Sequence, residues 1–454
     1  MRPRVALLGQ PRDGIGDNRI QGSVAIVLSN LARQLGESCE VVAVAPQLDN
    51  QDSHGTTSGG LEVHRVPVGS RRIEKGLELL DPRSLPRILR PGCYHGYFER
   101  AAAKLAEIGP DLVHVMTFAQ AAPVLRRRLP DVPLVLHLHD AMLARVDPAL
   151  AAERLAPFSA IVTCSEWLAH VLRIHVPAAA ARIWPIGNGV DPALFQAPAR
   201  AQWDGPLSRL LMVGRISPEK GPHVLIDAFC QIAADYPELE LELAGPLGLL
   251  PLAQARQACL GAPAMQDAVD RFYGGFLAGI GNQLLHPADR LRQRLEASIP
   301  ASLRPRVRMA GGRSHAQITE AYRAADILVQ PSVWQEPFGL PVAEGMAMGL
   351  PVIASNEGGP TDLVRHGETG LFVPPGDAPA LARAIRELLD DPPRARAMGA
   401  AGRERAMRAL TWHSVAERLL GVYEGILPDR EALAVPVPPP ADTADQVLVQ
   451  PILT

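Results

Sequence analysis

The chain of 454 residues predicts an α/β fold built from two doubly wound domains, each with a parallel sheet. Short apolar segments alternate with amphipathic helical stretches in both halves, as expected when helices cover both faces of a parallel sheet. A linker rich in Pro and Gly, APARAQWDGP at 197–206, interrupts the alternation. Two such halves would bind a ligand at the carboxyl ends of their strands, in a cleft between the domains.

The pattern predicts each element in turn. In the first half, the expected strands are 5–9, 41–45, 61–66, 112–116, 134–138 and 160–163. The helical patterns between them include 24–35, 94–108 and 167–174. In the second half, the expected strands are 209–213, 240–244, 307–310, 327–330, 351–354 and 371–373. Segment 411–427 predicts a final helix, and 246–305 is too long for a bare loop, so we expect it to be helical in part.

Composition excludes several classes of protein. Lys and Arg number 45 against 48 Asp and Glu, so no basic excess indicates nucleic-acid binding. The apolar run before Gln10 is too short for a signal peptide, and no apolar run approaches the ~18 residues that cross a bilayer. Five scattered cysteines without metal-like spacing are typical of a reducing compartment, so we expect a cytoplasmic protein. Basic clusters at 71–72, 83–90 and 126–128 are interpreted as solvated faces, with peripheral contact to the inner face of the membrane as the alternative.

Two carboxylates, Glu336 and Glu344, lie with seven residues between them in PSVWQEPFGLPVAE, 331–344. Each can accept hydrogen bonds from the hydroxyls of a sugar. The spacing alone is weak support, because two glutamates eight positions apart occur by chance in most chains. The alternative interpretation is a helix N-terminus with favourable acidic residues.

The same segment predicts an anion site at the start of a helix. Pro341 suits the first helical turn, since the N–H that it lacks would be unpaired there. The amides of Phe338, Gly339 and Leu340 would then lie at the free N-terminus, where partial positive charge favours phosphate or carboxylate.

A pair of cations follows another predicted strand. LLMVGRISPEKG at 210–221 predicts a strand that ends at Gly214, then a cap at Ser217 with proline at the first helical position. Arg215 and Lys220 would flank this N-terminus, where a cation pair can stabilise a departing anionic group without a metal. The alternative is a pair of solvated basic side chains.

Two motifs in the first half are less specific. The loop PRDGIGDNRIQGSV at 11–24 follows the first strand. Its glycines, Gly22 among them, would let the backbone approach a phosphate group or a second substrate. LHLHD at 136–140 places His139 at the end of a strand, with His137 on the same face if the strand persists. A buried, orienting histidine is the alternative for His139, and Asn188 in PIGNGVD is interpreted as part of a structural turn.

The segment GMAMGLPVIASNEGGPTDLVRHGETGLFVPPGD at 345–377 continues with a helix, a short strand, a Gly-Gly turn and a further strand. Together with 331–344, it resembles the second domain of the retaining, nucleotide-sugar-dependent glycosyltransferases of family 4. That resemblance covers nearly all of 1–427 and implies the GT-B architecture, two facing Rossmann-like domains with an interdomain cleft. The domains would be 1–196 with the crossover helix 411–427, and 207–410. A Pro-rich tail at 428–454 is expected to be disordered.

The resemblance also implies roles for residues of the second domain. Glu344 would bind the ribose hydroxyls and Glu336 the hydroxyls of the donor sugar. Arg215 and Lys220 would hold the diphosphate. Arg313 follows the strand that ends near the nucleotide base, and is expected to contribute its backbone rather than its guanidinium group.

In the first domain, the resemblance assigns His139 to the donor sugar or the acceptor, without separating it fully from His137. The family usually has a Gly-Gly pair where this chain has Gly22 and Ser23. That departure leaves the phosphate contact of the first loop open.

The expected function is therefore that of a retaining hexosyltransferase that uses a nucleotide-diphosphate sugar, with no cofactor and no metal. The acceptor would be a glycan, a lipid-linked molecule or a small molecule. Two alternatives are a catalytically silent sugar-nucleotide-binding or scaffold protein, and a nucleotide-sugar epimerase of the same fold. Retention is expected because the sequence offers neither a clear inverting base nor a carboxylate nucleophile, although His139 could be interpreted as such a base.

Overall fold

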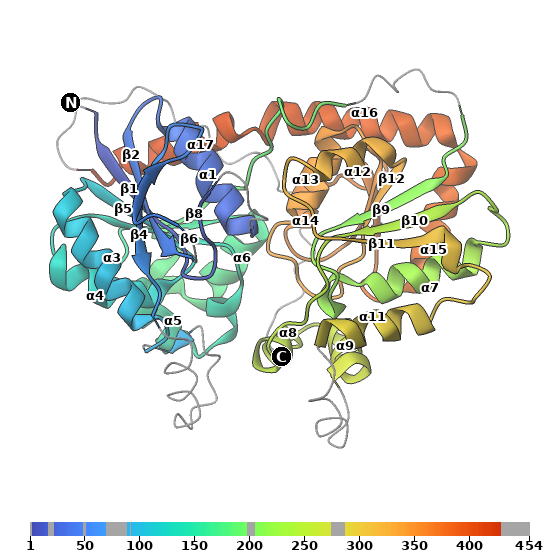
Figure 1. Ribbon diagram of the computed structural model, residues 1–454, viewed down its shortest axis with the longest axis horizontal. Helices are drawn as coiled ribbons and strands as arrows, with labels where there is room; N and C mark the ends of the chain where they lie inside the picture. The colour runs from blue at the N-terminus through green and yellow to red at the C-terminus, as the bar shows by residue number, and fades with distance from the viewer. Residues whose placement is uncertain are drawn as a thin grey trace. The chain divides into compact units, whose positions relative to one another are not determined.

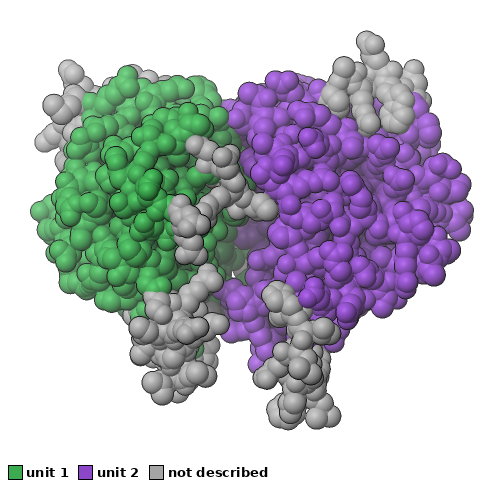
Figure 2. All heavy atoms as spheres, in the orientation of Figure 1, with its two compact units in different colours: residues 1–189, 412–446 green, residues 190–411, 447–454 purple. Residues whose placement is uncertain are grey.

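The computed structural model describes residues 2–16, 22–48, 51–69, 89–90, 92–197, 205–273 and 287–427. These residues form two compact units, which Figure 2 colours separately. The first unit contains the described residues up to 189 together with 412–427, and the second contains those from 190 to 411. The chain therefore returns to the first unit with its last helix (Figure 1).

The first unit is built on an eight-stranded sheet with the order β3-β4-β2-β1-β5-β6-β7-β8. Its strands are β1 (Arg4–Leu8), β2 (Glu40–Gln47), β3 (His54–Thr56), β4 (Glu62–Pro67), β5 (Leu112–Met116), β6 (Leu134–Leu138), β7 (Ala160–Thr163) and β8 (Ile183–Pro185). All neighbouring strands pair in parallel except the edge strand β3, which runs antiparallel to β4.

Helices connect the strands of the first unit. They are α1 (Ser23–Leu35), α3 (His95–Ile108), η2 (Ala119–Ala121), α4 (Ala122–Arg128), η3 (Met142–Arg145), α5 (Pro148–Leu155), α6 (Glu166–His175), η4 (Pro177–Arg182) and α17 (Trp412–Glu424). Helix α17 packs beside α1. At its start, Trp412 lies so close to Gly189 that a Cβ on Gly189 would be 2.7 Å from the indole, so this turn requires glycine.

The second unit has a six-stranded parallel sheet with the order β11-β10-β9-β12-β13-β14. Its strands are β9 (Arg209–Val213), β10 (Glu240–Ala244), β11 (Val307–Gly311), β12 (Ile327–Gln330), β13 (Val352–Ser355) and β14 (Gly370–Val373). Its helices are η6 (Pro218–Lys220), α7 (Pro222–Ile232), α8 (Leu252–Ala258), α9 (Pro263–Tyr273), α11 (Pro287–Ala297), η7 (Arg304–Arg306), α12 (Ile318–Ala324), α13 (Leu340–Ala347), α14 (Pro360–Leu363), α15 (Ala378–Asp390) and α16 (Pro392–Ala409).

The central strands are buried on both faces. Every residue of β12 and β13 is buried, which requires cover on either side of the sheet. Helix α7 packs beside α15, and α13 packs beside α16. Strand β9 lies between β10 and β12, because Leu210 of β9 pairs with Leu241 on one side and with Ile327 on the other.

Strand order fixes where a ligand can bind in the second unit. The chain runs outward from β9 through β10 to β11 and then returns to β12 on the other side of β9. The order therefore reverses between β9 and β12, and open α/β sheets bind ligands at the carboxyl ends of the strands at such a point. In the first unit, the corresponding reversal lies between β1 and β5.

The strands and helices expected by residue range are confirmed, with boundaries within one or two residues, or three at the end of the final helix. The helix expected to begin just after Ser217 starts four residues later, at Pro222. Strands β3 and β8 were missed by the sequence analysis. Both lie at the sheet edges and are three residues long, which is too short to show a strand pattern, and β3 contains a glycine while β8 ends in a proline. Within 246–305, helices α8, α9 and α11 confirm the partly helical prediction.

Several sequence-based predictions fall outside the described residues. They concern the tail at 428–454, the basic clusters at 71–72 and 83–88, and parts of the glycine-rich segments 11–24 and 246–305. Among the helices of the described ranges, none has the length and apolar character needed to cross a bilayer.

Candidate active site

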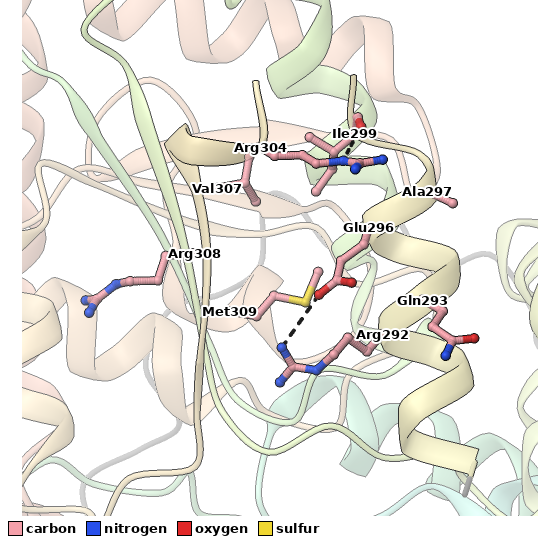
Figure 3. A pocket seen from close by; sticks show the side chains of 9 residues that line it. All are labelled: Arg292, Gln293, Glu296, Ala297, Ile299, Arg304, Val307, Arg308 and Met309. Atoms are coloured by element: carbon pink, nitrogen blue, oxygen red, sulfur yellow. Dashed lines mark hydrogen bonds and ion pairs between the residues drawn. The ribbon is translucent and has the colours of Figure 1, made fainter. Parts of the chain in front are cut away.

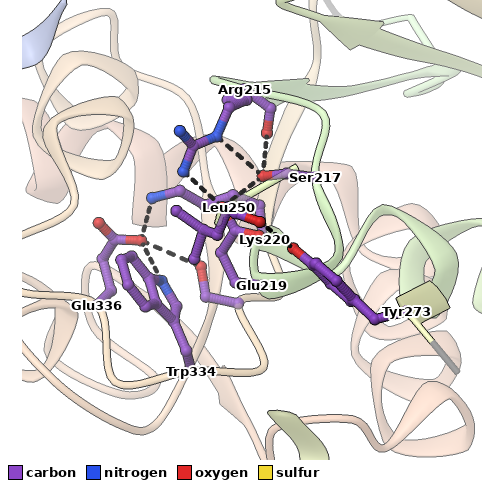
Figure 4. A network of polar contacts seen from close by, with 9 residues as sticks. Arg215, Ser217, Glu219, Lys220, Leu250, Tyr273, Trp334 and Glu336 are labelled. Carbon is purple, nitrogen blue, oxygen red and sulfur yellow. Dashed lines mark hydrogen bonds and ion pairs between the residues drawn. The ribbon is translucent and has the colours of Figure 1, made fainter. Parts of the chain in front are cut away.

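Residues that follow β9 and β12 meet at the reversal point of the second sheet (Figure 4). Lys220, after β9, forms an ion pair with Glu336, after β12. Its ammonium also lies 5.2 Å from the ring centroid of Trp334, a favourable cation–π arrangement. Both partners are mostly shielded from solvent, with exposed side-chain fractions of 19% for Lys220 and 14% for Glu336. The structure thus brings together two of the predicted site residues.

The carboxylate of Glu336 is held through one oxygen. Its Oε2 accepts hydrogen bonds from Lys220 Nζ, from Trp334 Nε1 at 3.0 Å and from Ser332 Oγ at 3.4 Å. Figure 4 shows the other oxygen pointing away from these three donors. Because a carboxylate oxygen can accept two hydrogen bonds, this second oxygen is available to the hydroxyls of a ligand.

Arg215 is positioned by a buried glutamate. Its Nη2 forms an ion pair with Glu219 Oε1 at 2.6 Å, and its Nε donates to Ser217 Oγ at 3.3 Å. Ser217 Oγ in turn donates to the same Glu219 oxygen at 2.6 Å. Glu219 is fully buried, whereas the Arg215 side chain is 40% exposed. One edge of the guanidinium is therefore fixed, and the rest of it faces outward (Figure 4).

The helix expected after Ser217 begins later than the sequence analysis placed it. Residues after Ser217 form only the short η6 turn, and α7 starts at Pro222. Gly221 separates the two because its φ of 73° cannot continue a right-handed helix. A Cβ on Gly221 would lie 1.9 Å from the carbonyl oxygen of Pro331, so β9 and β12 approach closely here. Lys220 thus ends η6 and directly precedes Gly221, the N-cap of α7.

The predicted N-terminus after β12 is present as α13. Its N-cap is Gly339, with a φ of 95°, and proline lies in its first turn. Within the described residues, the amides of Phe338, Gly339 and Leu340 donate no hydrogen bond to another backbone group. They are the unpaired donors that a helix N-terminus offers to an anion.

The turn at Gly358 and Gly359 packs against this loop. A Cβ on Gly358 would lie 2.3 Å from the Glu336 carbonyl oxygen, and one on Gly359 would lie 2.4 Å from that of Pro337. The Gly359 amide donates to the Glu336 carbonyl at 2.7 Å. The two glycines therefore let the segment after β13 fix the backbone that carries Glu336.

Glu344 lies inside α13 and is 5% exposed. His315 Nε2 lies 2.8 Å from its Oε1, and the Tyr322 hydroxyl donates to its Oε2 at 2.6 Å. Burial alone would lower the pKa of His315, but the hydrogen bond and charge of Glu344, with the charge of Asp191, outweigh it and raise the pKa above its ordinary value. His315, whether protonated or neutral, and the Tyr322 hydroxyl therefore fix the position of the Glu344 carboxylate.

Arg313 follows the edge strand β11, and its Nη2 forms an ion pair with Glu242 Oε1 at 3.0 Å. Glu242 also pairs with Arg308. The guanidinium group of Arg313 is thus held in an ion pair at the edge of the sheet.

In the first unit, His139 ends a column of buried aromatic side chains. Its ring centroid lies 4.2 Å from that of His137, and His137 Nδ1 lies 3.2 Å from His114 Nε2. His114 Nδ1 lies 2.7 Å from the hydroxyl of Tyr423 on α17. Burial lowers the pKa of His139 to about 3, so its imidazole is neutral near pH 7.

Gly22 immediately precedes α1, as predicted, but a carboxylate occupies the space beside it. A Cβ on Gly22 would lie 2.4 Å from an Asp13 carboxylate oxygen, and Gln10 donates to Asp13 at 2.6 Å. Burial raises the pKa of Asp13, although Gln10 and Arg12 act in the opposite direction. A phosphate at Gly22 would have to displace this carboxylate.

Some residues of the site escaped the sequence analysis. The i, i+4 spacing of Arg215 and Glu219 could have indicated their ion pair. No local signal pairs His315 and Tyr322 with Glu344, because 29 and 22 residues separate them.

Thr117, after β5, has a φ of 69° and a buried hydroxyl without a hydrogen-bond partner. Such a conformation in a β-branched residue marks strain at the reversal point of the first sheet.

A cavity of about 540 Å³ lies elsewhere in the second unit, between α11 and the edge strand β11 (Figure 3). Arg292 and Glu296 form an ion pair along its wall at 3.7 Å. The cavity is not lined by Arg215, Lys220, Arg313, Glu336 or Glu344, so we do not assign the sugar donor to it.

Known proteins resemble this chain in both halves. Residues 277–405 match the family described as Glycosyl transferases group 1, and residues 24–194 match Glycosyltransferase Family 4. A D-inositol 3-phosphate glycosyltransferase from Kineococcus radiotolerans is 30% identical over 463 residues, covering 94% of each chain. The chain therefore belongs to the group 1, family 4 glycosyltransferases, which transfer a sugar from a nucleotide sugar.

Solved structures show the same fold. Sucrose-phosphate synthase from Thermosynechococcus elongatus superimposes with a TM-score of 0.70 at 24% identity, covering 93% of this chain and 99% of its own. HepE from Anabaena, solved with UDP-glucose, gives a TM-score of 0.63 at 19% identity, covering 93% and 100%. The predicted GT-B fold is confirmed, while the cleft between the units stays a prediction.

The contact between His315 and Glu344 predicts a pH-dependent stability. The pKa of His315 is higher in the folded state than in the unfolded chain, so its protonated form stabilises the fold. This contribution is present in full at pH values below the ordinary histidine pKa of about 6.5. That contribution is lost as the pH rises through the raised pKa. We expect His315→Gln to reduce the free energy of unfolding by ~1.5–3 kcal/mol at low pH, the contribution of a charged hydrogen bond, and by less at high pH.

Urea unfolding of wild type and variant at about pH 6 and pH 9 measures this difference. His413→Gln is the matched control, since that exposed histidine on α17 pairs only across one helical turn, with Glu417 at 3.3 Å. A His315→Gln effect of equal size at both pH values would contradict the assignment.

Proposed function

We propose that this glycosyltransferase moves a hexose from a nucleotide-diphosphate sugar to its acceptor, with retention of the anomeric configuration and without a metal ion. The observation that carries the proposal is the cluster of Arg215, Lys220 and Glu336 at the reversal point of the second sheet, beside the free amides that precede α13. It combines cations for a diphosphate with a carboxylate for sugar hydroxyls.

The diphosphate would lie between the two cations and the α13 N-terminus. As the glycosidic bond breaks, the nucleoside diphosphate gains negative charge, and preorganised positive groups stabilise it in the transition state. The fixed guanidinium of Arg215 supplies one such group and the Lys220 ammonium a second. The amides of 338–340 supply neutral donors and the positive end of the helix dipole. This arrangement needs no divalent cation to neutralise the leaving group.

Glu336 would bind the hydroxyls of the hexose through the oxygen that its protein partners leave uncovered. Its three contacts on Oε2 hold the carboxylate in place when the sugar is absent. Lys220 contacts the Glu336 carboxylate and, in this proposal, the phosphate as well. Its ammonium would therefore lie between the group that binds the sugar and the groups that bind the leaving diphosphate.

Glu344 would accept the ribose hydroxyls. Each of its oxygens already has one donor, from His315 or Tyr322, and each retains a second lone pair. Such partners orient the carboxylate, as hydrogen-bonded supporting groups do in preorganised sites. Arg313 would contribute its backbone near the base, because Glu242 holds its guanidinium.

His139 would act as a neutral hydrogen-bonding group from the first unit. With a pKa of about 3, its imidazole carries no charge near pH 7 and is a poor general base. This weakens the inverting alternative. The remaining route is attack on the face from which the leaving group departs, with the departing phosphate accepting the proton of the acceptor.

The hexose and the class of acceptor rest on similarity alone. The name of the Kineococcus relative specifies an inositol phosphate as its acceptor, and HepE was solved with a UDP-hexose. We propose a glycan, a lipid-linked molecule or a small polyol for this chain. We also propose a cytoplasmic enzyme, because its five cysteines form no disulfide.

The stereochemical outcome tests the function directly. Purified protein is incubated with α-linked UDP-, GDP- and ADP-hexoses and a set of acceptors, and the anomeric proton of the product is observed by NMR. We expect an α-linked product from an α-linked donor. A β-linked product would contradict retention, and the absence of transfer from every donor despite nucleotide binding would support the silent-binder alternative.

The two carboxylates should separate binding from turnover. Glu344→Gln should weaken nucleoside-diphosphate binding by ~10–100-fold, corresponding to the ~1.5–3 kcal/mol of a charged hydrogen bond. Glu336→Gln should leave that affinity nearly unchanged and reduce kcat, because its proposed partner is the sugar. Calorimetric titration and steady-state kinetics measure the two effects.

Glu404→Gln serves as the control, since this exposed glutamate on α16 pairs only with Arg408 at 3.6 Å. Both affinity and turnover should stay at the wild-type level in that variant. If Glu336→Gln and Glu344→Gln lost diphosphate affinity equally, the proposed division of roles would be wrong.

A further inference from the structure

Two histidines and a glutamate gather on the edge hairpin of the first sheet, away from the strand ends that carry His139 and Gly22. His54 on β3 lies directly opposite His64 on β4, and Glu62 lies two residues before His64 on the same face. The His54 and His64 ring centroids are 4.7 Å apart. Nothing in the proposed transfer reaction uses these three side chains.

Their ligand atoms converge on one point. Glu62 Oε1 lies 3.1 Å from His54 Nε2 and 3.0 Å from His64 Nε2, and all three ligand atoms lie within 4.8 Å of one another. Tetrahedral zinc with bonds of ~2.0–2.2 Å places neighbouring ligand atoms ~3.3–3.5 Å apart. Two of the three separations are already close to this value, and the third needs only a small movement of His54, which is 57% exposed.

The hairpin backbone holds the three residues in register. Gly55 pairs with Val63 between the His54–His64 pair and Glu62, and the Arg65 amide donates to the Ser53 carbonyl at 2.6 Å. At the turn, Thr57 Oγ1 accepts from the Leu61 amide at 3.2 Å. The strands that carry the ligands are therefore fixed before any ion binds, which lowers the entropic cost of binding.

We propose that His54, Glu62 and His64 form a zinc site with a fourth position open to solvent. Two neutral imidazoles and one carboxylate are a ligand set that proteins use for Zn²⁺ with an exchangeable position. In the described residues, no other group of three His, Cys, Asp or Glu side chains gathers its ligand atoms this closely. The ion would clamp the edge strand β3 to β4 across their antiparallel pairing.

Zinc titration of the metal-stripped full chain tests the site. Calorimetry with ZnCl₂ should show one ion per chain, and His64→Gln and Glu62→Gln should each weaken its binding by at least ~10-fold. His413→Gln is the control, because His413 forms an exposed pair with Glu417 at 3.3 Å but has no third ligand. It should bind zinc as the wild type does.

A second readout separates this site from adventitious binding. Co²⁺ in place of zinc should give the visible absorption of a four-coordinate ion in the wild type, and His54→Gln should abolish it. Zinc should also raise the Tm of the wild type but not that of His64→Gln. Equal zinc stoichiometry and affinity in wild type, His64→Gln and Glu62→Gln would overturn the proposal.

Discussion

Three glutamates in the segments that follow β9 and β12 set the constraint on which the site depends. Glu219, Glu336 and Glu344 are buried or nearly so, and a carboxylate that leaves water without a partner is strongly destabilising. Each is compensated differently: Glu219 by Arg215 and Ser217, Glu336 by Lys220, Trp334 and Ser332, and Glu344 by His315 and Tyr322. Two of the compensating groups, Arg215 and Lys220, are also the cations that we propose for the diphosphate.

The ion pair between Lys220 and Glu336 has a further consequence. Removal of one partner from a buried pair costs ~3–5 kcal/mol, so the pair fixes both side chains while the site holds no donor. A diphosphate would offer the ammonium a second anion without removing the first. Under the proposed function, the protein would keep a cation near the leaving group in either condition, and donor binding would require no large rearrangement of charge.

Backbone geometry brings these charges together. Gly221 permits the β9 and β12 connections to touch, Gly339 starts α13 from a left-handed conformation, and Gly358 lies against the Glu336 backbone. In each case a side chain would clash or be strained. The amphipathic strand and helix patterns therefore account for the two sheets, while these glycines account for the positions of the functional groups between the strands.

Much of this was predictable from the chain. Largely apolar segments such as 327–330 and 209–213 predicted their strands correctly, because a strand that is buried on both faces is apolar over most of its length. Arg215, Lys220, Glu336 and Glu344 follow recognisable motifs. The partners His315 and Tyr322 were not predictable, since their contact with Glu344 depends on how the connection between β11 and β12 folds over α13. The helix after Ser217 was placed too early, because Gly221 stops the first turn in a way that local propensity does not reveal.

Turnover by Arg215→Met and Lys220→Met in excess EDTA tests most directly whether these two cations stabilise the leaving group without a metal. Arg209→Met is the matched control, since Arg209 starts β9 at the opposite end of the strand and is 52% exposed. We predict full wild-type activity in EDTA, a loss of ~10²–10³ in kcat for each of the first two variants, and no loss for the control. Wild-type activity that vanishes in EDTA and returns with Mg²⁺ or Mn²⁺ would contradict this account.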